Sequence, residues 1–272
     1  MRRFAFVPAL ALAVGLIASP AAAAESDTLY LALGDSLAWG DGASDPATTA
    51  YVPLLADYFA GAANGGAKSA VNLAVRGETT SSFLGGQMNG ALATILDPAT
   101  DTRIVTLSIG GNDLLNLLNE PTDACVIDPA SLECQLGLAQ ALGEVATNYP
   151  TIMGTLAVAL ANDPGTEKVY VLTLYNPFGG TGSPFEAAVD QGLLGVDLTV
   201  DCAAAQANPM NAGLNDIVSC TSAFFGATVV DGFQTIGDNA LALTHIGDPG
   251  FNIHPNDDGY AAIAKAHRRA AR

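Results

Sequence analysis

The chain has 272 residues, is half hydrophobic, and carries a formal net charge of −17 at pH 7. Such acidity excludes nucleic acid as a favourable partner and disfavours anionic membrane surfaces, because like charges repel. The hydrophobic content suffices for one substantial core of the α/β class, and no linker or low-complexity stretch divides it.

The first 24 residues resemble an export signal. Two arginines precede an apolar run over residues 4–18, and alanines occupy positions 21–24. The run is short for a membrane span, so we expect cleavage before Glu25 and a secreted protein. Loss of the two arginines changes the net charge from −17 to −19. The mature chain, residues 25–272, is expected to form one domain without a membrane segment and to act as a monomer.

Short apolar runs rich in β-branched residues predict five buried strands. They cover residues 28–33, 70–75, 103–109, 168–174 and 227–230. Helical spacing is found at 51–59, 83–96, 132–160 with a break expected near Pro150, 203–225 with an interruption at Pro209, and 261–271. This alternation predicts a parallel sheet with helices on both faces, whose ligands bind beyond the carboxyl ends of the strands.

Four cysteines in an exported chain are expected to form disulfides. Of the three possible connectivities, the sequential one closes the shortest loops, and it pairs Cys125 with Cys134 and Cys202 with Cys220. A metal site would need closer pairs such as Cys-x-x-Cys. We therefore predict two local disulfides and no metal.

A serine follows the first predicted strand directly, in Gly34-Asp35-Ser36-Leu37. The Ser36 hydroxyl should lie at the carboxyl edge of the sheet, where it could act as a nucleophile if a base lies within hydrogen-bond distance. A serine in this position could also cap the following helix.

The next two strands are also followed by glycine or polar residues. Gly77 stands just past the second strand, where its backbone N–H could approach an acyl oxygen closely. After the third strand comes Gly110-Gly111-Asn112-Asp113, in which the Asn112 amide could donate an N–H that an aspartate could not. Asn112 could also form a turn or a helix cap, and Gly77 an ordinary turn.

Three histidines are candidates for the base. His267 lies in a basic run that we expect to be a solvated helix end, and His245 precedes a Gly-Asp-Pro turn where it could be structural. His254 lies in a loop before the last predicted helix, from which an imidazole could reach the sheet edge. We therefore predict His254 as the general base.

Taken together, these segments resemble the SGNH hydrolases, also called the GDSL lipase/esterase family. The corresponding blocks, in the family's order, are Gly34-Asp35-Ser36-Leu37, Gly77, Gly110-Gly111-Asn112-Asp113 and His254-Pro255. The resemblance implies a flavodoxin-like, three-layer α/β/α sandwich with a five-stranded parallel sheet.

The resemblance also implies the roles of particular residues. Ser36 would be the nucleophile and His254 the base, and the N–H groups of Ser36 and Gly77 would form the oxyanion hole together with the Asn112 side-chain amide. Asp35 would hold the Ser36 and Asn112 loops together rather than act as an acid.

One position departs from the family pattern. The family commonly has an aspartate three residues before the histidine, where this chain has Phe251. Asp248, six residues before His254, could reach the imidazole Nδ1 and complete a triad. A main-chain carbonyl near Phe251 could instead fix the tautomer and leave a Ser-His dyad.

Large apolar residues near the catalytic segments could line an acyl groove or simply pack in the core. We predict a substrate-binding role for Trp39, Leu114, Phe178 and Phe251. Residues 179–201, with their glycines and Pro184, are expected to form a lid or rim. The prediction is a secreted serine esterase or lipase that acts on a small-molecule or lipid ester without a cofactor. A carbohydrate O-deacetylase and a catalytically silent binding module are the alternatives, whereas a nucleotide-dependent enzyme lacks its phosphate-binding motif.

Overall fold

The structure is a computed structural model that describes residues 27–118, 120, 122–163, 165–207 and 211–272. The predicted signal peptide and Pro209 lie outside the described residues. Within the described ranges, no helix is both long enough and apolar enough to cross a membrane.

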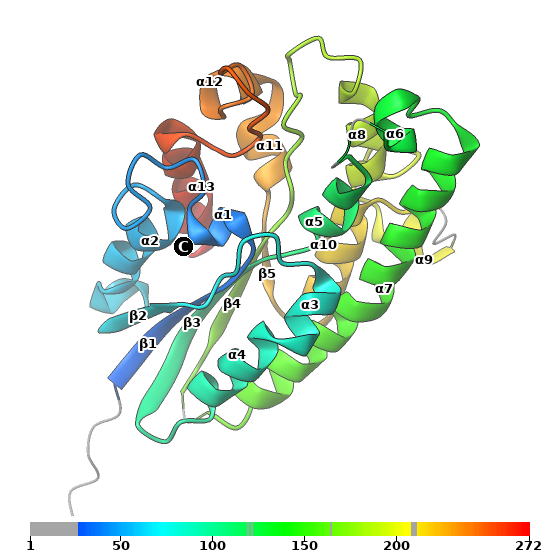
Figure 1. Ribbon diagram of the computed structural model, residues 1–272. Coiled ribbons are helices and arrows are strands. Elements are labelled where there is room, and N and C mark those ends of the chain that lie inside the picture. Colours follow the sequence, from blue (N-terminus) through cyan, green and yellow to red (C-terminus); the bar gives the residue numbers. More distant parts are fainter. Residues whose placement is uncertain (1–26, 119, 121, 164, 208–210) are drawn as a thin grey trace, which may run out of the picture.

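In the described part of the chain, five parallel strands form one sheet in the order β2-β1-β3-β4-β5 (Figure 1). The strands are β1 (Asp27–Gly34), β2 (Ser69–Asn72), β3 (Thr100–Ser108), β4 (Lys168–Leu172) and β5 (Thr228–Val230). Each overlaps a strand that the sequence predicts. In the central pair, β1 and β3 keep one register from Tyr30 opposite Ile104 to Gly34 opposite Ser108, so both strands deliver their following loops to the same edge.

Strand side chains alternate between two hydrophobic cores, one on each face of the sheet. Leu31, Val105 and Val171 contribute to one core, and Tyr30 and Ile104 contribute to the other. Because both faces are apolar, both must be covered by helices.

The helices divide between these faces, which confirms the predicted three-layer α/β/α sandwich. The first core is covered by α3 (Thr80–Gly85), α4 (Gln87–Ile95), α7 (Leu132–Leu160), α8 (Glu186–Leu194) and α10 (Leu214–Phe224). The second is covered by α1 (Ser36–Trp39), α2 (Tyr51–Phe59), α11 (Gly232–Ile236), α12 (Ala240–Leu243) and α13 (Asp257–Ala270). Figure 1 shows α2 and α13 on one side of the sheet and α3, α4 and α7 on the other. The remaining short elements are η1 (Ala62–Asn64), α5 (Gly111–Leu115), η2 (Asn116–Leu118), α6 (Ala124–Ile127), α9 (Cys202–Ala207) and η4 (Gly237–Asn239).

Some helix boundaries differ from the prediction. The helix expected at 83–96 is split into α3 and α4 at Gly86, whose backbone angles are not helical. The break expected near Pro150 is wrong, since α7 continues through this residue. Tyr149 and Ile152 on either side of it are fully buried, so packing keeps both halves of the helix in line.

The final helix begins earlier than expected. Asn256 caps α13, because its side-chain oxygen accepts the N–H of Gly259 at 3.0 Å. The segment expected to be a lid or rim contains α8.

Both disulfides have the predicted sequential pairing. Cys125–Cys134 joins α6 to the first turn of α7, and Cys202–Cys220 joins α9 to α10.

Candidate active site

Ser36 lies at the junction of β1 and α1. The strand ends at Gly34, whose φ is +134° and where a Cβ would overlap the carbonyl oxygen of Ser108. Only glycine fits this close approach. Ser36 follows as the first residue of α1, at the carboxyl end of the sheet.

The carboxylate of Asp35 secures this turn. Its Oδ1 accepts the N–H of Leu37 at 3.0 Å and lies 3.5 Å from the Ser108 hydroxyl, while the Asp35 N–H donates to the Ser108 carbonyl at 3.0 Å. Burial raises the pKa of Asp35 to about 7. Asp35 therefore links the carboxyl ends of β1 and β3.

The predicted nucleophile and base lie within hydrogen-bond distance, because Nε2 of His254 is 2.8 Å from Oγ of Ser36. His254 is carried by the loop between α12 and α13. Two contacts hold this loop. One is an antiparallel bridge between Thr244 and Pro255, and the other is a 2.9 Å hydrogen bond from the His245 N–H to the His254 carbonyl. The imidazole thus projects from a loop that is pinned on both sides.

The partner of the other imidazole nitrogen is a residue that sequence reasoning missed. Nδ1 of His254 lies 2.9 Å from Oδ1 of Asn252, and the same oxygen accepts the backbone N–H of His254 at 3.1 Å. A backbone N–H can only donate, so the amide oxygen, not its NH₂ group, faces the histidine. Nδ1 therefore carries the proton, and Nε2 presents a lone pair to Ser36.

Two of the three predicted oxyanion-hole residues, Gly77 and Asn112, follow β2 and β3. The Asn112 amide donates to the carbonyl of Glu78 at 2.9 Å, which ties it to the loop of Gly77. Gly77 has a φ of +73°, and a Cβ at this position would meet nothing within 4 Å, so the space beside its backbone is open.

A buried glutamine, also missed from the sequence, supports this loop. Gly34 donates its N–H to Oε1 of Gln87 at 2.7 Å, and Nε2 of Gln87 donates to the Gly34 carbonyl at 2.8 Å. The same Nε2 donates to Oε2 of Glu78 at 3.0 Å. Gln87 therefore connects the strand end before Ser36 to the loop of Gly77.

A model of the GDSL-like lipase/acylhydrolase family matches residues 32–262. The chain belongs to this family. It is therefore a carboxylic ester hydrolase.

Solved structures with the same fold are distant in sequence from this GDSL-like acylhydrolase. An extracellular lipase from Streptomyces rimosus is 22% identical, with a TM-score of 0.58 over 89% of this chain and 99% of that chain. A phospholipase A1 from Streptomyces albidoflavus is 23% identical, with a TM-score of 0.58 over 89% of this chain and 98% of that chain. An acetylxylan esterase from Geobacillus stearothermophilus is 15% identical, with a TM-score of 0.52 over 90% and 94%. Among curated proteins, no sequence matches.

In this acylhydrolase, Ser36 and His254 border an apolar cavity. Of the four predicted substrate-binding residues, Leu114, Phe178 and Phe251 line the cavity and Trp39 does not. Trp39 is the last residue of α1 and is about half exposed to solvent, whereas Leu37 and Ala38 before it are buried.

Asp248 does not occupy the position that a triad would require. Its N–H donates to the His245 carbonyl at 3.0 Å, and this turn brings its Oδ2 within 2.6 Å of Nδ1 of His245. Nε2 of His245 faces the carbonyl of Gly42 at 2.7 Å. Because both partners only accept, they favour the protonated imidazole, and the hydrogen bond to Asp248 raises the pKa of His245.

A charged pair lies close to the predicted base. Oδ2 of Asp41 is 4.0 Å from Nε2 of His254, and the Asp41 carboxylate accepts from Nε of Arg76 at 2.7 Å. Burial lowers the pKa of His254. The negative charge of Asp41 opposes this shift, whereas the positive charges of Arg76 and His245 add to it.

The expectation for His267 is wrong, because this residue is completely buried. Its ring stacks on Tyr51 with centroids 5.3 Å apart, and its Nδ1 donates to the carbonyl of Ile263 at 2.9 Å. The sequence contained a sign of this: Tyr260, Ile263 and His267 recur at helical spacing on the buried face of α13. Among the described residues, no group of three or more His, Cys, Asp or Glu side chains could hold a metal ion.

Proposed function

We propose that the protein cleaves carboxylic esters through an acyl-Ser36 intermediate, with His254 as general base. The observation that carries this proposal is the 2.8 Å distance between Oγ of Ser36 and Nε2 of His254. A serine hydroxyl is a weak nucleophile until a base accepts its proton, and the neutral tautomer of His254 offers that base.

In the first step, Oγ attacks the ester carbonyl carbon while its proton moves to Nε2 of His254. The negative charge that forms on the carbonyl oxygen is stabilised by the backbone N–H groups of Ser36 and Gly77 and by the side-chain amide of Asn112. The protonated His254 then gives its proton to the alkoxide that leaves, and the acyl group remains bound to Ser36.

In the second step, a water molecule attacks the acyl carbon and loses a proton to His254. The tetrahedral intermediate collapses, the carboxylic acid departs, and the proton returns from His254 to Oγ of Ser36. Bonds and protons balance over the two steps, and the net reaction adds one water to the ester.

The orienting group in this mechanism is the amide of Asn252. It fixes the tautomer of His254 as a carboxylate would, but it has no net charge with which to stabilise the imidazolium. The arrangement therefore corresponds to a Ser-His dyad with an amide positioning residue. The contact between Asp248 and His245 argues against an Asp248 triad.

We also propose that the enzyme is secreted after removal of residues 1–24. The apolar run behind two arginines and the two disulfides support this localisation. Expression of the full chain should yield protein in the medium that begins at Glu25, as read from its intact mass. Retention of the leader in all of the recovered protein would contradict the proposal.

Hydrolysis of p-nitrophenyl butyrate by the purified mature protein tests the function. We expect turnover that falls to the buffer blank in Ser36→Ala. Ser81→Ala, at an exposed serine on α3, provides the matched control and should keep full activity. A wild-type protein with no turnover on any ester would favour the catalytically silent binding module.

A further inference from the structure

The cavity beside Ser36 extends to the Cys125–Cys134 disulfide. The lining includes Ser36 and His254 at the catalytic end and both cysteines. Between them it is formed largely by leucine, valine and phenylalanine side chains. An apolar cavity of this kind accommodates a hydrocarbon chain, which gains free energy when it leaves water.

Helix α5 and the 3₁₀ turn η2 form one wall between these two ends. α5 begins at Gly111, where a Cβ would lie 3.8 Å from Oδ2 of Asp35, the neighbour of Ser36. The chain continues without interruption into η2, and η2 contacts α6. This wall therefore runs from the neighbourhood of Ser36 to the helix that carries Cys125.

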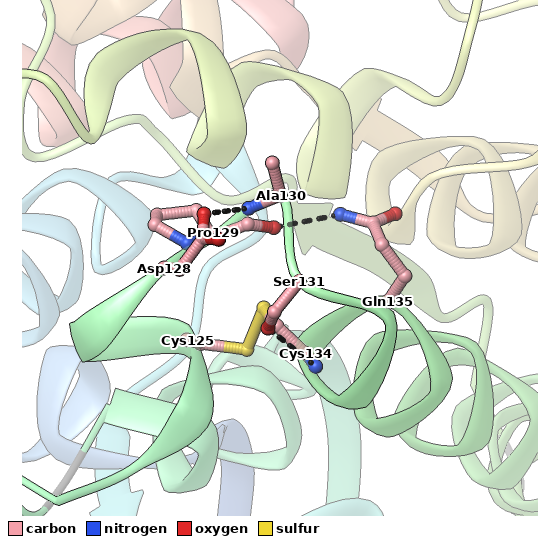
Figure 2. The surroundings of a disulfide bond; sticks show 7 residues. All are labelled: Cys125, Asp128, Pro129, Ala130, Ser131, Cys134 and Gln135. Carbon is pink, nitrogen blue, oxygen red and sulfur yellow. Dashed lines mark hydrogen bonds between the residues drawn. A yellow bond between two sulfur atoms is a disulfide. The ribbon is translucent and has the colours of Figure 1, made fainter.

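The disulfide fastens a small loop to α7 (Figure 2), and Pro129 in this loop lines the cavity. Both cysteines are buried, with 6% of their surface exposed. The loop makes hydrogen bonds to its own near neighbours: Oδ1 of Asp128 accepts the Ala130 N–H at 3.0 Å, and the Pro129 carbonyl accepts from Gln135 at 2.8 Å. Such local bonds shape the loop, whereas the disulfide fixes α6 against α7.

We propose that the Cys125–Cys134 disulfide is the distal wall of an acyl-chain site and thereby sets the enzyme's preference for long acyl chains. This inference rests on the proposed function. An acetyl or butyryl group bound to Ser36 occupies only the catalytic end. A longer chain reaches the leucine-rich part of the cavity and the wall that the disulfide holds in place.

The test is a chain-length series of p-nitrophenyl acetate, butyrate, octanoate and palmitate, measured as kcat/KM. In the wild type, octanoate or palmitate should be preferred over acetate. In Cys125→Ser/Cys134→Ser the ratio of the long-chain to the butyrate value should fall about tenfold, the effect of leaving roughly two methylene groups exposed to water.

The second disulfide provides the matched control. Cys202 and Cys220 are not among the residues that line the cavity, so Cys202→Ser/Cys220→Ser removes a disulfide without touching the acyl site. This variant should keep the wild-type ratio. An equal fall in both double variants would overturn the proposal, because it would reflect general loosening of the fold.

If the disulfide variant does not fold, a second pair of variants tests the proposed acyl-chain site. A Cβ at Gly192 would lie 3.6 Å from Leu114 and 3.7 Å from Leu138, so Gly192→Leu should fill the cavity and abolish the long-chain preference. Gly143 is an exposed helical glycine with open space around it, and Gly143→Leu should leave the preference unchanged.

The outcomes separate this inference from the proposed function. A wild-type enzyme that hydrolyses acetate best, with activity abolished by Ser36→Ala, would overturn the acyl-chain site and leave the serine mechanism intact. Turnover that persists in Ser36→Ala would overturn both.

Discussion

Nδ1 of His254 lies 2.9 Å from Oδ1 of Asn252, the residue two positions before it in the chain. The backbone N–H of His254 binds the same oxygen and thereby fixes the orientation of the amide. A neutral amide thus binds Nδ1 of His254, the proposed base, with no carboxylate at this nitrogen.

Replacing Asn252 with alanine should reduce kcat about tenfold, which corresponds to about 1.4 kcal/mol for one lost hydrogen bond. KM should change little, because Asn252 is not among the residues that line the cavity. Asn252→Asp should restore kcat and move the acid limb of the pH profile to higher pH, since a carboxylate raises the pKa of His254.

Asp248→Asn is the control for this prediction. Its carboxylate is largely exposed and pairs with His245, and exposed pairs contribute roughly 0–1 kcal/mol. A larger loss of kcat in Asp248→Asn than in Asn252→Ala would show that Asp248, and not Asn252, orients the imidazole of His254.

Asn112→Ala should lower kcat by about 10²–10³, the usual effect of removing one oxyanion donor. Asn112→Asp should be no better, because a carboxylate repels the developing oxyanion. Steady-state kinetics on p-nitrophenyl butyrate provide the measurement, with the exposed Asn89→Ala on α4 as control. Full activity in Asn112→Ala would show that Asn112 is not part of the oxyanion hole.

The pH profile of kcat/KM should report the pKa of His254, which must be neutral to act as base. Burial lowers this pKa, so the acid limb should lie below the ordinary histidine value of about 6.5. Arg76→Gln should move the limb to higher pH, because Asp41 then loses its partner. Asp41→Asn should move it to lower pH, because Arg76 and His245 remain.

These opposite shifts should shrink at high salt, since Arg76 is mostly exposed. Shifts in the same direction in Arg76→Gln and Asp41→Asn would contradict the electrostatic account of His254.

His267 should make the fold sensitive to acid. Burial lowers its pKa in the folded protein to about 4, whereas in the unfolded chain it lies near 6.5. The unfolded chain therefore binds the proton first as the pH falls, and stability is lost from about pH 6.5 to about pH 4, by about 3 kcal/mol in all. Above about pH 6.5 the ring of His267 is neutral in both the folded and the unfolded state, so it does not change stability with pH.

His267→Phe retains an aromatic ring against Tyr51 but cannot titrate. Between about pH 7 and pH 5 its free energy of unfolding, measured with urea, should fall by about 2 kcal/mol less than that of the wild type. Parallel pH dependence in the two proteins would show that His267 titrates normally.

The sequence predicted the strands and the pair Ser36 and His254 because both depend on patterns that are local in the chain. A buried strand that ends in glycine places the next residue at the sheet edge, and the alternation of strands and helices determines the order of layers. Gln87 was missed because its role depends on which backbone groups approach it in space, and no local pattern encodes that. Asn252 was missed although its contact with His254 is local, of the Asx-turn type, because only carboxylates and main-chain carbonyls were considered as partners of the imidazole.

The prediction for Asp248 was limited by what spacing along the chain can show. Its spacing to His254 allowed a contact, but the turn from His245 to Asp248 directs the carboxylate to the nearer histidine, His245. Trp39 also lies close to Ser36 in the chain, yet it is about half exposed to solvent and does not line the cavity.

Covalent labelling with a fluorophosphonate tests the central claim most directly, because phosphorus bonds to an activated serine oxygen and fluoride leaves. Intact mass and peptide mapping should show a single adduct on Ser36 in the wild type, none in Ser36→Ala, and much slower labelling in His254→Ala. An adduct on another serine, or equal labelling rates in the wild type and His254→Ala, would contradict a nucleophile at Ser36 activated by His254.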